Sequence, residues 1–243
     1  MAAKPKFTRV LLKISGEALK GSREFGVDPA FIEKLVSQIR EVHELKVKIG
    51  IVLGGGNFFR VTIEAAAHMN RAVADSIGMI ATVINSLMVQ DALEAKGVPS
   101  RVLSAIEMRD VCEPYIRRRA LRHLEKGRVV ILAGGTGNPY FSTDSAAALR
   151  ANEMGSDVLI KATKVDGVYT ADPAKDPSAR RLPRVSYQEA IAMNLRVMDT
   201  SALSLCRDNN IPIIVCDLLK PGNIRRVICG RKIGTLVGGD DHA

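Results

Sequence analysis

The stretch VKIGIVLGGG (residues 47–56) sets the architecture of this chain. An aliphatic run, 47–53, ends directly in three glycines, as expected of a strand buried on both faces of a parallel sheet. The same plan recurs in RVVILAGGTGNP (residues 128–139), where the run 128–133 meets a second glycine cluster. Two such units predict a parallel sheet whose glycine loops allow the backbone to approach a ligand beyond the carboxyl ends of the strands.

Outward from these stretches, strand patterns alternate with helical periodicity, which is typical of α/β proteins. We expect further strands at 9–14, 101–103, 157–162, 212–216 and 235–237, and helices at about 29–45, 65–96, 113–125, 144–154 and 201–208, with another opened by Pro221. Asp28 before Pro29 predicts a helix N-cap, and Ser186 with Glu189 has the spacing of a capping box. Asp166-Gly167 predicts a tight hairpin within 164–169. The Pro-rich, charged loop 172–183 is expected to be the most mobile segment.

No break in composition and no repeat of 20 to 50 residues divides the chain. We therefore predict a single domain over residues 1–243. Its fold class is α/β, a three-layer αβα sandwich with a mainly parallel central sheet.

The composition of the 243 residues, 47% hydrophobic and 25% charged, is that of an ordinary globular protein. No uninterrupted apolar run approaches the roughly 18 residues of a membrane span, and the N-terminus lacks a signal peptide pattern, so a cytoplasmic protein without membrane partners is expected. The four cysteines are widely spaced and form no CxxC pair, which favours buried free thiols over a zinc or redox site.

A net charge of +9 favours anionic partners but does not distinguish polymers from small phosphates. The basic runs Arg117-Arg118-Arg119 and Arg180-Arg181 have no interleaved aromatic rings, and the chain has no Trp, 4 Tyr and 6 Phe. A platform for stacking single-stranded nucleic acid is therefore not expected, and the runs are interpreted as a solvated helix face and a loop.

Lys13 and Lys161 stand at the ends of two predicted strands, near the glycine loops, and Lys161 is expected to approach from the opposite side of the crevice to Lys13. Two lysines that converge on one phosphoryl group would neutralise the charge on its oxygens, although each alone could be a solvent contact at a strand end. Asp144 could hold both ammonium groups, or could simply cap its helix. Asp199 has the position of a cap before the helix at 201–208, and Asp172 that of a turn residue.

Together these residues resemble the bacterial UMP kinases (uridylate kinases) of the amino acid kinase family, across nearly the whole chain. The segments that carry the resemblance are KISGEAL (13–19), GGGNFFR (54–60), MNR (69–71), GGTGNP (134–139), TDSAA (143–147), KATKVDGVYTADP (161–173) and VMD (197–199). Sister kinases acting on carboxylates or carbamate share the first two glycine-rich loops, but not GTGNP or KATKVDGVYTADP.

The resemblance implies the amino acid kinase fold and transfer of the γ-phosphoryl group of ATP to UMP, with Mg²⁺ carried by ATP. It implies ATP-binding roles for Lys13, Ile14, Ser15, Gly16, Gly56, Arg60, Thr163, Tyr169 and Asp172. It implies UMP-binding roles for Gly55, Asp75, Thr136, Gly137, Asn138, Pro139, Tyr140, Phe141, Ser142 and Thr143. The implied catalytic residues are Lys13, Lys161, Asp144 and Asp199, with no metal ligand among them; Arg60 could instead form a salt bridge between helices.

The resemblance further implies a homohexamer activated by GTP and inhibited by UTP. The region implied to respond to GTP comprises Gly21, Ser22, Arg23, Glu24, Phe25 and Gly26. The N-terminal part is expected to hold mainly UMP and the oligomer contacts, and the C-terminal part mainly ATP. One departure is Val61, where the family pattern has glycine; it predicts a stiffer loop. The alternatives are a kinase for another small acid, a non-catalytic nucleotide or oxyanion binder, and a nucleic-acid binder acting through the basic runs.

Overall fold

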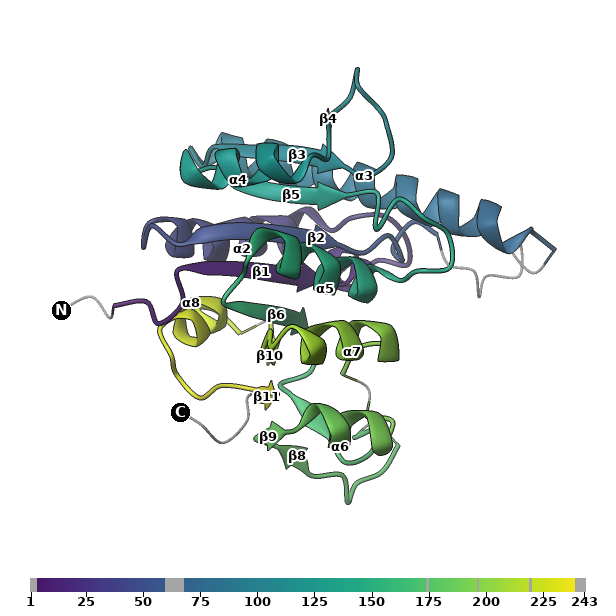
Figure 1. Ribbon diagram of the computed structural model, residues 1–243, viewed down its shortest axis with the longest axis vertical. Coiled ribbons are helices and arrows are strands. Elements are labelled where there is room, and N and C mark those ends of the chain that lie inside the picture. The colour runs from purple at the N-terminus through teal and green to yellow at the C-terminus, as the bar shows by residue number, and fades with distance from the viewer. Residues whose placement is uncertain (1–3, 60–67, 174, 196, 219, 239–243) are drawn as a thin grey trace.

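A nine-stranded sheet runs through the computed structural model, which describes residues 4–59, 68–173, 175–195, 197–218 and 220–238 (Figure 1). Its strand order is β4-β3-β5-β2-β1-β6-β10-β11-β9, and all neighbours are parallel except β10 and β11. The strands are β1 (Arg9–Ile14), β2 (Lys48–Leu53), β3 (Ser100–Ser104), β4 (Glu113–Pro114), β5 (Val129–Ala133), β6 (Val158–Thr163), β9 (Arg184–Val185), β10 (Ile213–Asp217) and β11 (Thr235–Val237). The predicted mainly parallel sheet is confirmed.

Helices cover both faces of this sheet and complete the three expected layers (Figure 1). One face packs against α1 (Gly16–Leu19), α2 (Pro29–His43), α3 (Arg71–Ala95) and α8 (Asn223–Ile228). The other packs against α4 (Arg117–Glu125), α5 (Thr143–Met154), α6 (Tyr187–Ala192) and α7 (Thr200–Asp208). The pleat sends successive side chains to opposite faces, so Leu12 joins the first core and Leu11 the second. The central strands are apolar throughout because both faces are covered.

The local start signals of two helices are confirmed. The Asp28 carboxylate accepts a hydrogen bond from the Ala30 amide at 3.0 Å, at the start of α2. Ser186 and Glu189 form the reciprocal capping box of α6. Both devices satisfy amides that have no partner inside the helix, so they fix where these helices begin.

Two local predictions are wrong. Residues 113–125 do not form one helix, because Glu113–Pro114 is the edge strand β4 and α4 begins at Arg117. The tight hairpin at Asp166-Gly167 is absent: β7 (Val168–Tyr169) pairs antiparallel with β8 (Arg181–Leu182) across the intervening loop. Strand β6 already has β1 and β10 on its two edges, so no chain can fold back onto it.

The helix α3, Arg71–Ala95, is the one helix among the described residues that is long and apolar enough to cross a bilayer by length and composition. Helices in the core of globular proteins can have the same length and composition, and α3 packs against α2, β3 and β5. Its apolar character is therefore explained on one side by contact with the sheet.

The four cysteines all lie within the described residues, and none of them forms a disulfide. Cys206 and Cys216 are buried, and burial raises the pKa of each thiol to about 12. Cys112 and Cys229 are half-buried. The buried pair is thiol at neutral pH and packs as apolar core.

Candidate active site

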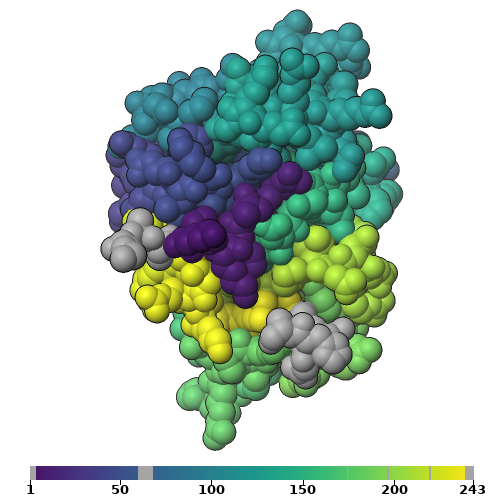
Figure 2. Space-filling model, turned by 60° about the vertical axis from the view of Figure 1, so that its left-hand side comes forward, coloured from purple at the N-terminus to yellow at the C-terminus, as the bar shows by residue number. Residues whose placement is uncertain are grey.

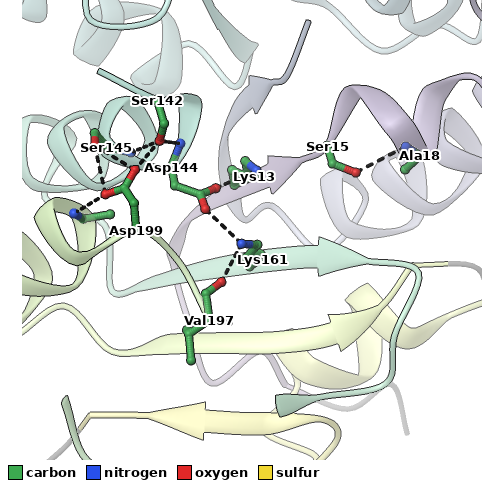
Figure 3. Close-up of polar contacts among 10 residues, drawn as sticks. Lys13, Ser15, Ala18, Ser142, Asp144, Ser145, Lys161, Val197 and Asp199 are labelled. Atoms are coloured by element: carbon green, nitrogen blue, oxygen red, sulfur yellow. Dashed lines mark hydrogen bonds and ion pairs between the residues drawn. The ribbon is translucent and has the colours of Figure 1, made fainter. Parts of the chain in front are cut away.

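Lys13 and Lys161 lie side by side at the carboxyl ends of two adjacent strands (Figure 3). Lys13 of β1 is the register partner of Lys161 of β6, so the two side chains leave the same face of the sheet. The expectation that they approach from opposite sides of a crevice is wrong, because β1 and β6 are direct neighbours. Lys13 is 6% exposed, which excludes the alternative of a simple solvent contact.

Asp144, in the first turn of α5, joins the two lysines. Its Oδ1 lies 2.5 Å from Lys13 Nζ, and its Oδ2 accepts a hydrogen bond from Lys161 Nζ at 2.9 Å (Figure 3). Lys161 Nζ also donates to the Val197 carbonyl at 2.5 Å. One carboxylate therefore bridges two ammonium groups that would otherwise repel each other, and it leaves a net positive charge.

Ser142, not Asp144, caps α5, and it links this helix to α7. The Ser142 hydroxyl accepts hydrogen bonds from the Asp144 and Ser145 amides at 2.9 and 3.2 Å. The hydroxyls of Ser142 and Ser145 both donate to the Asp199 carboxylate, which also caps α7 by accepting from the Ala202 amide. Asp199 thus acts on Asp144 through the α5 N-terminus, and sequence reasoning missed both serine hydroxyls because their partner is 54 or more residues away.

The pKa values of the group follow from burial and charge. Burial by itself raises the pKa of the Asp144 carboxyl, but Lys13 and Lys161 together outweigh it and hold that pKa below its usual range. Burial lowers the pKa of Lys161, and Asp144 partly opposes that shift. Asp144 is therefore an anion at neutral pH, and its negative charge favours the protonated form of Lys161.

The two glycine-bearing turns beside the lysines touch each other. A Cβ added at Gly16 would lie 2.6 Å from the Gly56 amide nitrogen and 2.9 Å from the Gly54 carbonyl oxygen. Only glycine at position 16 permits this approach of the turn after β1 to the turn after β2. The buried Asn57 and Asn85 amides bond to each other, and Asn85 Nδ2 also donates to the Gly54 carbonyl, which anchors the second turn on α3.

A pocket of about 210 Å³ contains many of the residues implied to bind UMP. Gly55, Asp75, Phe141, Ser142 and Thr143 line it, together with Gly56, which was expected on the ATP side. The Asp75 carboxylate accepts from the Tyr140 amide at 2.8 Å and from Arg71 Nε at 2.9 Å. Lining residues that the sequence reasoning missed are Phe59, Ala74, Gly78, Met79, Thr82 and Gly135.

The rest of the implied UMP segment does not line this pocket. Thr136, Gly137, Asn138, Pro139 and Tyr140 form the adjoining loop, where the Thr136 hydroxyl accepts from the Asn138 amide at 3.2 Å. Tyr140 is 70% exposed and has a φ of 70°.

A second pocket, of about 330 Å³, lies along β7 and the loop that follows it. Tyr169 and Asp172, two of the residues implied to bind ATP, line this pocket together with residues 193–195. Thr163 is not among the lining residues; its hydroxyl accepts from the Val165 amide and donates to the Val165 carbonyl. Tyr169 donates to Asp166 at 2.7 Å.

The segment 21–26 lies against the glycine turn that follows β2. The Gly26 amide donates to the Asn57 carbonyl, and Asn57 Nδ2 donates to the Gly26 carbonyl at 2.9 Å. Phe25 packs edge-on against Phe58, with ring centroids 5.4 Å apart. Of the other implied ATP residues, Ser15 caps α1 and Ile14 is buried in the core, while Arg60 lies outside the described residues. Val61, the departure from the family pattern, also lies outside them.

The carboxylates of this site do not form a metal cage. Within the described part of the chain, no three His, Cys, Asp or Glu side chains gather in a metal-binding group. Asp144 is committed to two lysines and Asp199 to a helix cap and two serines. This donor set fits a Mg²⁺ that is held mainly by nucleotide phosphates and water, as is usual for Mg²⁺ in kinases.

The αβα layers agree with comparisons with known proteins. The model of the amino acid kinase family matches residues 8–217, and the chain belongs to this family. It is 56% identical over 240 residues to a protein of Paramagnetospirillum magneticum named uridylate kinase, covering 99% of this chain and 100% of that protein.

Solved structures of two related proteins have the same fold as this chain. The crystal structure of UMP kinase from Bacillus anthracis matches with a TM-score of 0.93 at 39% identity, over 96% of this chain and 97% of that chain. That of UMP kinase from Ureaplasma parvum matches with a TM-score of 0.90 at 38% identity, over 96% and 99% of the two chains.

Proposed function

We propose that this protein is a UMP kinase, which transfers the γ-phosphoryl group of ATP to UMP and releases ADP and UDP. The observation that carries the proposal is the Lys13–Asp144–Lys161 group, located where the glycine turns meet. Belonging to the amino acid kinase family and full-length similarity to uridylate kinases supply the substrate class.

The chemistry needs no general base. A UMP phosphate has a second pKa near 6, so its oxygen is already an anion at neutral pH and attacks the γ-phosphorus directly. The bond from that phosphorus to the β,γ-bridging oxygen breaks, and ADP leaves with the electron pair. Lys13 and Lys161 neutralise charge on the transferred group, Asp144 keeps both ammonium groups in place, and Asp199 positions the α5 N-terminus. Mg²⁺, held by the ATP phosphates, would supply further positive charge.

The two pockets suit the two nucleotides. The 210 Å³ pocket borders Ser142 and Thr143 at the start of α5, beside Asp144, so we assign UMP to it with Asp75 accepting from the ribose hydroxyls. The 330 Å³ pocket of Tyr169 and Asp172 is assigned to adenosine, and the backbone of 14–16 with Gly56 and Arg60 to the ATP phosphates. The loop 136–140 would close over UMP. This division gives the C-terminal part of a single domain mainly the donor and the N-terminal part mainly the acceptor.

Assembly and regulation are part of the proposal. A cytoplasmic homohexamer, activated by GTP and inhibited by UTP, is proposed from the likeness to the bacterial enzymes. The contact of segment 21–26 with the glycine turn after β2 supports a conformational link between that segment and the candidate active site.

A coupled assay of ADP release tests the function. UMP, CMP, acetylglutamate and carbamate serve as acceptors, each with and without GTP. We expect turnover to be highest with UMP. Faster turnover with another acceptor would assign a different substrate, and UMP binding without any turnover would favour a non-catalytic binder.

A further inference from the structure

The basic run at 180–181 takes part in neither of the two pockets described above. It adjoins a third hollow, of about 360 Å³, which we name the basic groove. Its lining residues are Lys6, Phe7, Arg181, Pro183, Arg184, Ile214, Val227, Gly230, Arg231, Lys232, Ile233, Gly234 and Leu236. Figure 2 shows the purple N-terminal segment beside the yellow C-terminal segment, and both segments contribute residues to the lining.

The basic groove lies on the opposite face of the sheet from the lysines of the candidate active site. Ile214, Val227 and Ile233 pack in the core on the α8 side, whereas Lys13 and Lys161 leave the face covered by α5. Lys6 precedes β1 and Lys13 is near its carboxyl end, and seven residues of extended chain span about 23 Å. Ile214 and Leu236 form the floor at the β10–β11 pair, and Val227 of α8 forms a wall. A ligand here would not touch the proposed catalytic groups.

The charge of the groove is one-sided. Five of its lining residues are cationic, and none of the described lining residues is acidic. They come from three distant segments, with Lys6 before β1, Arg181 and Arg184 around β8 and β9, and Arg231 and Lys232 after α8. Converging like charges cost folding free energy, and a bound polyanion would remove that cost.

The backbone holds these cations in place. The Lys6 amide donates to the Ile228 carbonyl at 2.9 Å, and the Lys6 stem lies against Gly230. Arg181 Nη1 lies 3.4 Å from the Gly234 carbonyl, and its Nε lies 3.9 Å from an Asp166 carboxylate oxygen, so the charge of Arg181 is partly neutralised. The Leu236 amide donates to the Pro183 carbonyl, which joins the arginine segment to the floor.

We propose that the basic groove binds a small anion bearing several linked phosphates. Its size suits a compact ligand, and the apolar floor of Phe7, Ile214 and Leu236 would accept a nucleoside attached to those phosphates. Inorganic polyphosphate and a nucleoside triphosphate share this chemistry. An extended nucleic acid fits less well, because one aromatic ring, Phe7, lines the groove and offers no series of stacking positions.

Calorimetric titration of inorganic tripolyphosphate into the full chain tests the proposal. The groove variant carries Arg231→Glu and Lys232→Glu. The matched control carries Lys34→Glu and Lys126→Glu, two exposed lysines outside the groove with the same change in net charge. We expect the groove variant to bind tripolyphosphate at least roughly tenfold more weakly than the control. The thermal midpoint of each variant verifies that it is folded.

Equal binding by the groove variant and the control, or no binding by the unmodified chain, would overturn the proposal. CTP in a second titration distinguishes the sources: a larger loss for CTP than for tripolyphosphate in the groove variant identifies a nucleoside triphosphate, and an equal loss identifies the phosphates alone. A short single-stranded oligonucleotide is the third ligand. If the groove variant loses oligonucleotide binding but keeps tripolyphosphate binding, the surface is a nucleic-acid site and the proposal fails. These measurements need no turnover, so they are independent of the kinase assignment.

Discussion

At the scale of single residues, Asp144 determines the character of the site. The side chains of Lys13, Asp144 and Lys161 are 8%, 15% and 16% exposed, so water screens their interactions weakly. Removing Asp144 leaves two ammonium groups without a counter-charge in a poorly hydrated place, whereas removing either lysine leaves a neutral ion pair. Their contribution to catalysis and to folding can therefore be separated by choosing which one is changed.

Replacing Lys13 tests the catalytic role. We expect Lys13→Ala to lower kcat by about a hundred- to a thousandfold, because one of two charges on the transferred group is lost. The Michaelis constant for UMP should change little, since Lys13 does not line the proposed UMP pocket. Steady-state kinetics measure both, with the exposed Lys34→Ala of α2 as the control. Near-normal kcat in Lys13→Ala would remove this lysine from the reaction.

The pKa of Asp144 predicts an acid dependence of stability. Because the folded-state pKa lies below the usual value near 3.9, the ion pairs stabilise the fold fully above that value. Their contribution is lost as the pH falls through the folded-state pKa. At pH 7 we expect Asp144→Asn to lower the free energy of unfolding by about 3 kcal/mol.

The difference between Asp144→Asn and the unmodified chain should narrow once the pH falls below about 4. Chemical denaturation at a series of pH values measures it. Asp110→Asn changes an exposed carboxylate and is the control. A difference for Asp144→Asn that stays constant down to strongly acidic pH would contradict the ion-pair account.

At the scale of elements, the site depends on how closely two turns approach. The turn between β1 and α1 contacts the turn after β2 through Gly16, Gly54 and Gly56, and α3 anchors the second turn through Asn85. The strand ends place the lysines, whereas these glycine contacts place the peptide amides beside them.

A methyl group at Gly16 should separate the two turns. We expect Gly16→Ala to lower the free energy of unfolding by about 1–3 kcal/mol, because backbone atoms cannot move aside as a flexible side chain can. Gly78→Ala in α3 is the control: its Cβ meets nothing within 4 Å, and it should be neutral or stabilising by up to about 1 kcal/mol. Chemical denaturation compares the two. Equal stability of both variants would show that the approach of the turns is not tight.

At the scale of the whole molecule, α3 presents a second apolar face to solvent. Val73, Ile80, Ile84 and Met88 are 53%, 45%, 41% and 43% exposed and follow one another at helical spacing. An apolar stripe of this kind marks an interaction surface more often than a free surface. It supports the proposed assembly of several copies.

A charge in that stripe should disrupt the assembly. We expect Ile84→Glu to yield a smaller species than the unmodified chain, because a carboxylate buried in an apolar interface has no partner. Size-exclusion chromatography with light scattering measures the mass. Val111→Glu, which changes another exposed aliphatic residue, is the control. If Ile84→Glu and the unmodified chain have the same mass, the stripe is not an assembly surface.

Local patterns in the sequence specify the layers of the fold and the chemical groups at the site. Apolar runs ending in glycines at 54–56 and 134–137 specify buried parallel strands, and Asp28 and Ser186 specify where two helices begin, because these signals act between residues close in the chain. The same local patterns, with the family resemblance, singled out Lys13, Asp144 and Lys161.

The way in which these groups meet depends on contacts between distant parts of the chain. The pairing of β1 with β6, the bridge by Asp144, the serine contacts to Asp199 and the pairing of β7 with β8 join residues far apart in the sequence. The convergence of three basic segments on one groove has the same origin. Local periodicity does not encode such contacts, because strand order and helix packing depend on burial of the apolar surface of the whole chain.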